Sequence, residues 1–346
     1  SVRTGRECFR ALSMPEAVTL ASGVYRVRAS VPSRSKATAD MVQTDEAFWT
    51  IFSFHFLSGE AFTKADCDAG LTRAVLDATT ARRLFGTTDA VGHTVQLDYV
   101  DYTVAGVVAD VSMLATAAYA QIWVPYTAAG AEAMSWQNDT MGPMHAIILA
   151  RSSADFDAIR EETELLRKKY NDGLQDVEVF YRGQPDTQLA YLYRRWYAEP
   201  DVPGVMLRYA IVVIILLLVP AVNLSGRTLS RMRRRMAEIG VRKAFGATGG
   251  ELMRQVFFEN LVLTLLAGIV GLALSYVAAF ALNGFLFSNS MNASLSGETA
   301  LTPGMLLSPW AFIAAFAFCL LMNILSAGIP AWRASRMNIT DAINQR

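Results

Sequence analysis

The chain has 346 residues and no net charge, and 53% of its residues are hydrophobic although its first half is rich in charged ones. This length exceeds that of a usual single domain, so we expect one soluble domain of about 200 residues and a separate apolar part. The balanced charge argues against nucleic acid as a partner.

The first half of the chain is predicted to alternate strands and helices. Residues 72–77 have the short apolar character of a strand, and residues 78–86 are typical of a helix closed by a glycine. Residues 94–111 alternate like a hairpin. The pattern predicts an α+β domain.

A further helix is predicted to start at Ser153, whose side chain can cap it. Four apolar residues fall on one face of this helix, namely Phe156, Ile159, Leu166 and Tyr170. Residues 171–173 end the helix, and residues 177–181 are predicted to return as a strand. Residues 199–204 contain Pro and Gly and are predicted to link this domain to the apolar part.

Three uncharged apolar stretches follow, each close to the roughly 20 residues that cross a bilayer. A very large soluble core would be needed to cover all three, so we predict membrane-spanning helices. The stretches are residues 209–226, 260–283 and 309–331, and the helices are placed at about 207–229, 258–284 and 308–331. We therefore expect an α+β domain over residues 1–206 joined to an all-α membrane domain of three helices over residues 207–346.

The charges between the spans predict the orientation. Residues 227–254 hold eight Lys and Arg against two Glu, whereas residues 284–308 hold one Glu and no basic residue. Basic loops stay in the cytoplasm, so the first loop and the C-terminus are predicted to be inside and residues 1–206 outside. Export of such a domain needs a preceding helix, so a fourth span is expected before Ser1 in the intact protein.

No enzyme motif can be identified. GxSxG, HExxH and GxxxxGK[ST] are all absent, and the three histidines lack the spacing of metal ligands. There is no CxxC pair. Cys8 and Cys67 could pair in an oxidising compartment, although buried free thiols are the preferred interpretation. We predict a chain that is not an enzyme and binds no cofactor or metal.

Small residues recur every four positions along the second predicted span, at Ala267, Gly271, Ser275 and Ala279. A similar stripe runs along the third span, at Ala311, Ala315, Cys319 and Asn323. Small residues let helices approach closely, so we expect packing against a helix of this or a partner subunit. The spans carry no charged residue in their interiors, which argues against an ion-coupled transporter.

The basic loop contains more than positive charge. Contact of residues 227–235 with anionic lipid would explain the arginines alone. It does not explain the short amphipathic stretch at residues 238–245, which is followed by the breaker Gly246 and by glycines 249–250, predicted to be flexible. Residues 251–260 are predicted to resume a helix. An apolar and basic helix held between two membrane helices is typical of a docking element for a soluble partner.

At this loop the sequence resembles the permease family that includes MacB and FtsX. The family signature R-x-x-E-I-G-V-R-K-A-x-G-A corresponds to RRRMAEIGVRKAFGA at residues 233–247, and the likeness continues through residues 259–276. The first half resembles the family's extracytoplasmic core domain at residues 42–66, 89–111 and 122–126, and residues 330–346 resemble its closing motif. The sequence departs from the family at Ile339, where a proline is usual, and at Glu60, where Arg is frequent.

The resemblance implies a permease subunit of an ABC transporter in the bacterial inner membrane that does not hydrolyse ATP itself. A separate cytoplasmic ABC ATPase would bind ATP, and two permease copies, or this chain with a paired permease, would sit upon it. A periplasmic adaptor, an outer-membrane channel and membrane lipid are the other expected partners. The implied coupling helix consists of Glu238, Ile239, Gly240, Val241, Arg242, Lys243, Ala244, Phe245 and Gly246.

Three functions compete at this point. The first is a permease that transmits ATP-driven motion for export or efflux of an antimicrobial, lipid or lipoprotein. The second is a regulatory scaffold that uses the same motion to activate a periplasmic partner such as a cell-wall hydrolase. The third is a membrane-anchored sensor without an ATPase, which would have no reason to keep the docking loop.

Overall fold

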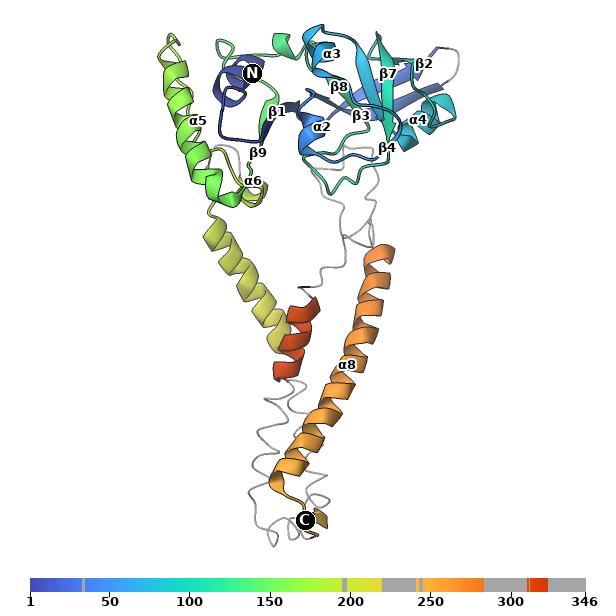
Figure 1. The fold of residues 1–346 in the computed structure, drawn as a ribbon, viewed down its shortest axis with the longest axis vertical. Coiled ribbons are helices and arrows are strands. Elements are labelled where there is room, and N and C mark those ends of the chain that lie inside the picture. The colour runs from blue at the N-terminus through green and yellow to red at the C-terminus, as the bar shows by residue number, and fades with distance from the viewer. Residues whose placement is uncertain are drawn as a thin grey trace. The chain divides into compact units, whose positions relative to one another are not determined.

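The structure, a computed structural model, describes residues 1–32, 35–194, 198–219, 241–242, 245–282, 310 and 312–322 (Figure 1). Among these residues, one compact unit covers Ser1–Pro200 and a second begins at Asp201. The first unit contains strands and short helices, so the predicted α+β class is confirmed for it. The predicted domain boundary between residues 206 and 207 stays a prediction.

A seven-stranded sheet forms the larger part of the first unit, in the order β4-β7-β5-β8-β3-β2-β6. Its strands are β2 (Tyr25–Val31), β3 (Ser35–Thr44), β4 (Phe56–Gly59), β5 (Arg73–Asp77), β6 (Thr94–Leu97), β7 (Val100–Val108) and β8 (Ile122–Pro125). Because β6 pairs with both β2 and β7, six of these strands close into a barrel. The β3–β8 and β5–β7 pairs are parallel and the other pairs are antiparallel.

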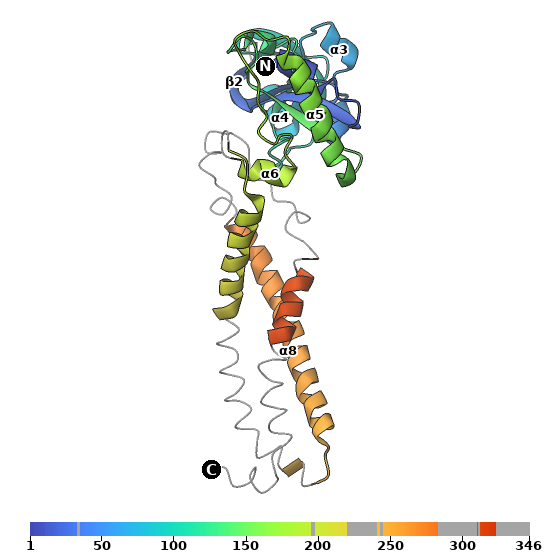
Figure 2. The same ribbon diagram turned by 90° about the vertical axis from the view of Figure 1, so that its left-hand side faces the viewer.

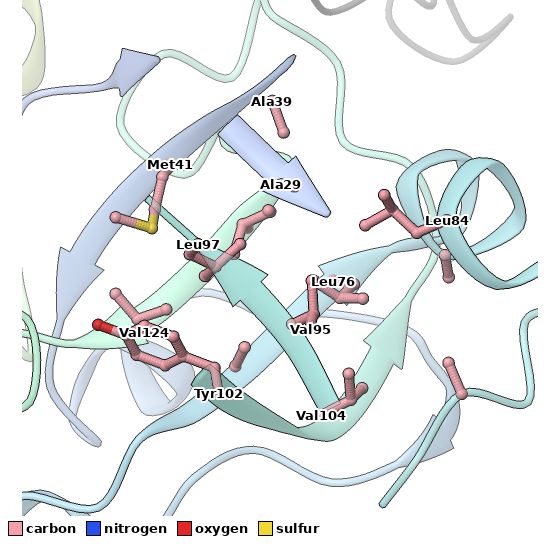
Figure 3. Close-up of a cluster of buried hydrophobic side chains, with 14 of the residues drawn as sticks. Ala29, Ala39, Met41, Leu76, Leu84, Val95, Leu97, Tyr102, Val104 and Val124 are labelled. Atoms are coloured by element: carbon pink, nitrogen blue, oxygen red, sulfur yellow. The ribbon is translucent and has the colours of Figure 1, made fainter. Parts of the chain in front are cut away.

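The barrel interior is filled by alternate side chains of its strands. Leu76, Val95, Tyr102 and Val104 converge there, and Leu84 of the helix α4 (Ala78–Phe85) lies beside them (Figure 3). Successive strand residues point to opposite faces, so every second residue reaches this core. The interior is therefore a packed core rather than a channel.

Three local predictions are confirmed in the barrel. The first predicted strand is β5, and α4 follows it and ends at Gly86, which takes the left-handed conformation at φ +80°. The predicted hairpin consists of β6 and β7, joined by the left-handed residues Asp98 and Tyr99. Strand β7 ends at Val108 rather than at residue 111, and its pairing with β6 extends only to Thr103.

Aromatic side chains cover the outer face of the barrel. Trp123 of β8 points outward, between the inward-pointing Ile122 and Val124. It packs edge-on against Trp49, with ring centroids 5.9 Å apart, and against Phe54 at 5.4 Å. The helices α2 (Phe48–Ile51) and α3 (Lys64–Asp68) contribute to this cluster. The cluster extends the hydrophobic core beyond the barrel.

A smaller lobe lies beside the barrel in the same unit. The antiparallel strands β1 (Ala17–Ser22) and β9 (Met144–Leu149) form it together with α1 (Val2–Thr4), the π-helix η1 (Gly5–Phe9) and α5 (Phe156–Asn171). Two short 3₁₀ turns, η2 (Ala131–Ala133) and η3 (Ser153–Asp155), complete it. Cys8 lies in this lobe and Cys67 in α3, and both are buried free thiols, in agreement with the preferred interpretation.

The predicted helix after residue 153 is α5, preceded by η3, and Ser152 rather than Ser153 provides the capping side chain. The predicted strand at residues 177–181 is wrong, because this segment pairs with none of the strands in the described part of the chain. Side chains of α5 bond to it instead. Asn171 accepts from the backbone N–H of Val179 at 3.0 Å and donates to its carbonyl, which also accepts from Arg167 at 2.7 Å.

Among its described residues, the second unit contains two helices long and apolar enough to cross a membrane by length and composition, Val202–Val219 and α8 (Gly249–Ala281). The first starts at Val202, before the predicted start at 207, and residues 220–229 lie outside the described residues. Helix α8 contains the predicted helix at 251–260. Of the third predicted span, 310 and the shorter helix Phe312–Met322 are described, so the count of three spans is not confirmed.

The buried carboxyl of Asp77 predicts a pH dependence of stability. Its Oδ1 accepts from the backbone N–H of Thr80 at 2.7 Å, and burial raises its pKa from 3.8 to about 6. Because this pKa is higher in the folded state than in the unfolded chain, the folded state is favoured when the carboxyl is protonated. This contribution to stability is fully present below pH 3.8 and is lost as pH rises through about 6. We expect Asp77→Asn, which keeps a cap without the charge, to raise the free energy of unfolding at neutral pH by about 2 kcal/mol.

Denaturant titrations of the detergent-solubilised protein across this pH range would measure the effect. Asp66 is the matched control, because bonds from the backbone and side chain of Thr63 lower its pKa. Its contribution is present above the ordinary pKa and lost on acidification, so Asp66→Asn should destabilise the protein at neutral pH by about 1 kcal/mol. Changes of the same sign in the two variants would contradict the assignment.

Candidate functional site

The predicted docking element, residues 238–246, is described in part. Val241, Arg242, Phe245 and Gly246 lie within the described residues. Five further residues lie outside them, namely Glu238, Ile239, Gly240, Lys243 and Ala244. The geometry of this element therefore rests on its second half.

Phe245 is the most exposed large hydrophobic residue of the part of the chain that is described, at 90% of its surface. Its backbone N–H donates to the carbonyl of Val241 at 3.1 Å, which is a helical bond. The following Gly246 takes φ +97°, and Ala247 N–H donates back to the carbonyl of Arg242 at 3.1 Å. This is a Schellman-type helix end, which confirms Gly246 as a breaker and leaves the Phe245 ring projecting beside the turn.

Helix α8 starts three residues after this turn. The Thr248 side chain accepts from Glu251 N–H at 3.3 Å, while the Glu251 carboxylate accepts from Thr248 N–H at 2.9 Å. These bonds lower the pKa of Glu251. The predicted flexibility of glycines 249–250 is wrong, because this capping box places both in the first helical turn. The T-x-x-E signal for it was present in the sequence.

A side-chain contact joins the docking element to α8. Arg242 Nη1 donates to Gln255 Oε1 at 2.7 Å, so the end of the short helix is tied to the second turn of the long one. Between them lies a hollow of about 430 Å³, lined by Arg242, Phe245, Gly246, Ala247, Glu251 and Gln255. The role of Gln255 as the partner of Arg242 was not predicted, because no spacing rule in the sequence indicates a contact between these two residues.

Helix α8 is long and uninterrupted. The 33 residues of α8 form one continuous helix, which at the usual rise is roughly 50 Å long. Its N-terminus lies at the capped turn that follows Phe245 in the sequence. Its apolar part, Phe257–Ala281, is long enough to cross a bilayer. A displacement of the docking element would therefore move a rigid rod rather than a loop.

The predicted packing stripe Ala267, Gly271, Ser275 and Ala279 lies along α8, and the structure does not test its role. A side chain added at Gly271 would meet nothing within 4 Å, and Ser275 donates to Leu272 of its own helix at 2.8 Å. The contact with the helix Phe312–Met322 lies elsewhere, where a side chain at Gly268 would meet Phe316 at 3.5 Å. Packing of the stripe stays a prediction.

Two family models match the chain. Residues 2–166 match the MacB-like periplasmic core domain, and residues 210–339 match the FtsX-like permease C-terminal domain. The first match covers the barrel and most of the lobe beside it, and the second covers the docking element and the apolar helices.

Curated relatives agree with this assignment. The macrolide export ATP-binding/permease protein MacB of Escherichia coli (strain K12) is 26% identical over 89% of this chain, and that of Chromobacterium violaceum is 25% identical over 88%. The chain spans 43% of the length of either relative. The crystal structure of the periplasmic region of MacB from Actinobacillus actinomycetemcomitans shares 18% identity at a TM-score of 0.39, covering 49% of this chain and 73% of that one. The sequence matches over both halves place the chain in the MacB/FtsX family of ABC transporter permeases.

Proposed function

We propose that the chain is the permease subunit of an ABC transporter and that a separate cytoplasmic ATPase docks on residues 238–246. The observation that carries the proposal is the exposed Phe245 ring. It lies at a helix end closed by Gly246, directly before the capped N-terminus of the continuous helix α8. Aromatic residues are enriched at protein interfaces, and this one is fully available to a partner. Because Phe245 lies next to the N-terminus of α8, an ATPase bound to it could move this helix.

The chemistry of the element fits a protein partner. Aromatic residues and arginine are enriched at protein interfaces, and Arg242 and Lys243 precede Phe245. Arg242 is already held by Gln255, so it loses little freedom on binding. We infer that Phe245 inserts into a pocket of the ATPase while the cations set the orientation.

The motion would then pass along α8 and along the helix Val202–Val219 to the domain of residues 1–200. In this proposal two copies of the chain sit on a pair of ATPases in the inner membrane, with that domain in the periplasm and the C-terminus in the cytoplasm. The relatives named as macrolide exporters support export as the task. A periplasmic adaptor and an outer-membrane channel would complete the path.

The test is co-purification of the ATPase with a variant that carries Arg242→Glu, Lys243→Glu and Phe245→Ala. Loss of one aromatic anchor costs about 2 kcal/mol, or roughly 30-fold in affinity, and the two charge reversals add repulsion against an interface that accepts cations. We expect the polypeptide that carries the ATP-binding motif to be lost from the purified complex.

Tyr99→Ala is the matched control, because Tyr99 in the barrel hairpin is an aromatic residue of similar exposure, 80% against 90% for Phe245. This control should retain the ATPase at the level of the unchanged protein. Unchanged co-purification of the triple variant would overturn the docking proposal.

A further inference from the structure

A short helix that the sequence did not reveal, α6 (Gln188–Tyr193), precedes the first apolar helix (Figure 2). Thr187 caps it by accepting from Ala190 N–H at 3.2 Å. Leu189, Tyr191 and Leu192 are exposed, whereas Ala190 and Tyr193 are partly buried. Besides Gln188, the solvent-facing side of α6 thus carries apolar side chains, where a surface helix usually carries polar ones.

An ion pair fixes α6 in this orientation. The guanidinium of Arg194 meets the carboxylate of Asp186, with both side chains 8% exposed, and one of its nitrogens lies 2.7 Å from Asp186 Oδ1. The same guanidinium donates to the carbonyls of Arg182 and Ala198, each at 3.1 Å. The residues before and after α6 are therefore tied together, so the outward apolar face is a built feature rather than a frayed end.

The position of α6 in the chain identifies what can cover this face. The apolar helix Val202–Val219 starts nine residues after Tyr193, and nine residues span at most about 30 Å. The intervening sequence contains Trp196 and Tyr197, residue types enriched where a protein meets the lipid headgroups. A helix with an apolar face, tethered this closely to a membrane span, is suited to lie in the interface plane.

We propose that the Leu189, Tyr191 and Leu192 face of α6 lies in the lipid headgroup region of the bilayer that the following helix enters. The ion pair beneath it would hold the Ser1–Pro200 unit on the membrane surface at a second point besides the chain itself. We infer lipid as the occupant of this face, because only nine residues separate the end of α6 from the start of an apolar helix long enough to cross a membrane. The proposal does not depend on ATPase docking.

Spin labels test this placement in the full chain, reconstituted without any ATPase into nanodiscs of equal parts phosphatidylcholine and phosphatidylglycerol. Leu192→Cys reports on α6, and Leu165→Cys on α5 is the matched control, since these leucines are 59% and 66% exposed. Both variants carry Cys319→Ser, because Cys8 and Cys67 are buried and only Cys319 is exposed among the natural cysteines. Neither labelled side chain belongs to a hydrophobic core.

We expect the label at residue 192 to collide several-fold more often with dissolved oxygen, which concentrates in lipid, than with a water-soluble nickel chelate. The label at residue 165 should show the opposite preference. A nickel accessibility at residue 192 equal to that at residue 165 would place α6 in water and overturn the proposal. Protection of residue 192 from both reagents would indicate a protein contact and would overturn it as well.

Discussion

Replacing Trp123 with alanine is expected to lower the free energy of unfolding of the Ser1–Pro200 unit by about 3–5 kcal/mol. Trp123 is fully buried and lies at the centre of the outer aromatic cluster, against Trp49 and Phe54. Alanine would leave a cavity between barrel and cluster that the closed barrel cannot collapse to fill. Denaturant unfolding in detergent, followed by near-ultraviolet circular dichroism, measures the loss.

Trp136→Ala is the control for this prediction. Trp136 is the same residue type but 51% exposed, in a loop bridged to Met141. We expect a change of about 0.5 kcal/mol or less for it. An equal loss of unfolding free energy in the two variants would contradict a stabilising role of the aromatic cluster.

Replacing Asp45 with alanine should cost a comparable amount, about 3–5 kcal/mol, because Asp45 joins the barrel to the smaller lobe. Its carboxylate follows β3 and accepts from Thr19 Oγ1 at 2.6 Å, from Leu20 N–H at 3.0 Å and from Ala47 N–H at 3.1 Å. Arg10 lies 2.9 Å away in an ion pair. The alanine variant would leave these buried donors without their acceptor.

Asp68→Ala tests whether the loss is specific to a buried carboxylate. Asp68 pairs with Lys64 at 2.7 Å, but both side chains are largely exposed. Exposed pairs contribute little, so we expect a change below about 1 kcal/mol. The same unfolding titration applies, and a loss in Asp45→Ala no greater than in Asp68→Ala would contradict the role of Asp45 as a link between barrel and lobe.

The Asp45 contacts and the aromatic cluster around Trp123 both matter for the proposed function. A domain that receives motion from the membrane helices must move as one body, and in sequence the lobe's helix α5 precedes the first apolar helix. The Asp45 contacts hold this lobe to the barrel. The aromatic cluster stiffens the barrel beside it. The proposed transmission therefore requires both features.

The parts of the fold that could be predicted are those with local signals. Strand β5, helix α4 and the β6–β7 hairpin each follow from alternation, a terminal glycine or a short turn within a few residues. The pairing of β1 with β9 joins Ala17 to Leu149, and no local pattern indicates which distant segment completes such a pair. The barrel closure depends on the same kind of long-range contact.

Two errors in the first unit have a physical origin. Residues 177–181 alternate like a strand, but Asn171 and Arg167 bond to Val179, so side chains replace a neighbouring strand. Helix α6 is six residues long, which is too short for a helical period to stand out. Its orientation depends on the Asp186–Arg194 pair, and the sequence does not show that these two charges meet.

The helix end at Gly246 was predictable because its local signals are dense, whereas the docking role of residues 238–246 stays a prediction. An apolar and basic run ending in Gly246 indicates an exposed helix end, and Phe245 is as exposed as that pattern predicts. The start of α8 was misjudged because two glycines usually mark flexibility, while the Thr248–Glu251 capping box outweighs them here. The Arg242–Gln255 contact required the structure.

In the proposed function, ATP-driven motion reaches the Ser1–Pro200 unit through Phe245. Hydrogen exchange of the complex with its ATPase, with and without a non-hydrolysable ATP analogue, measures it most directly. We predict that nucleotide changes the exchange of amides in residues 156–199, which lead into the first apolar helix, and that Phe245→Ala abolishes this change. Exchange that nucleotide leaves unaltered in the unchanged complex, or a response that persists in Phe245→Ala, would contradict the claim.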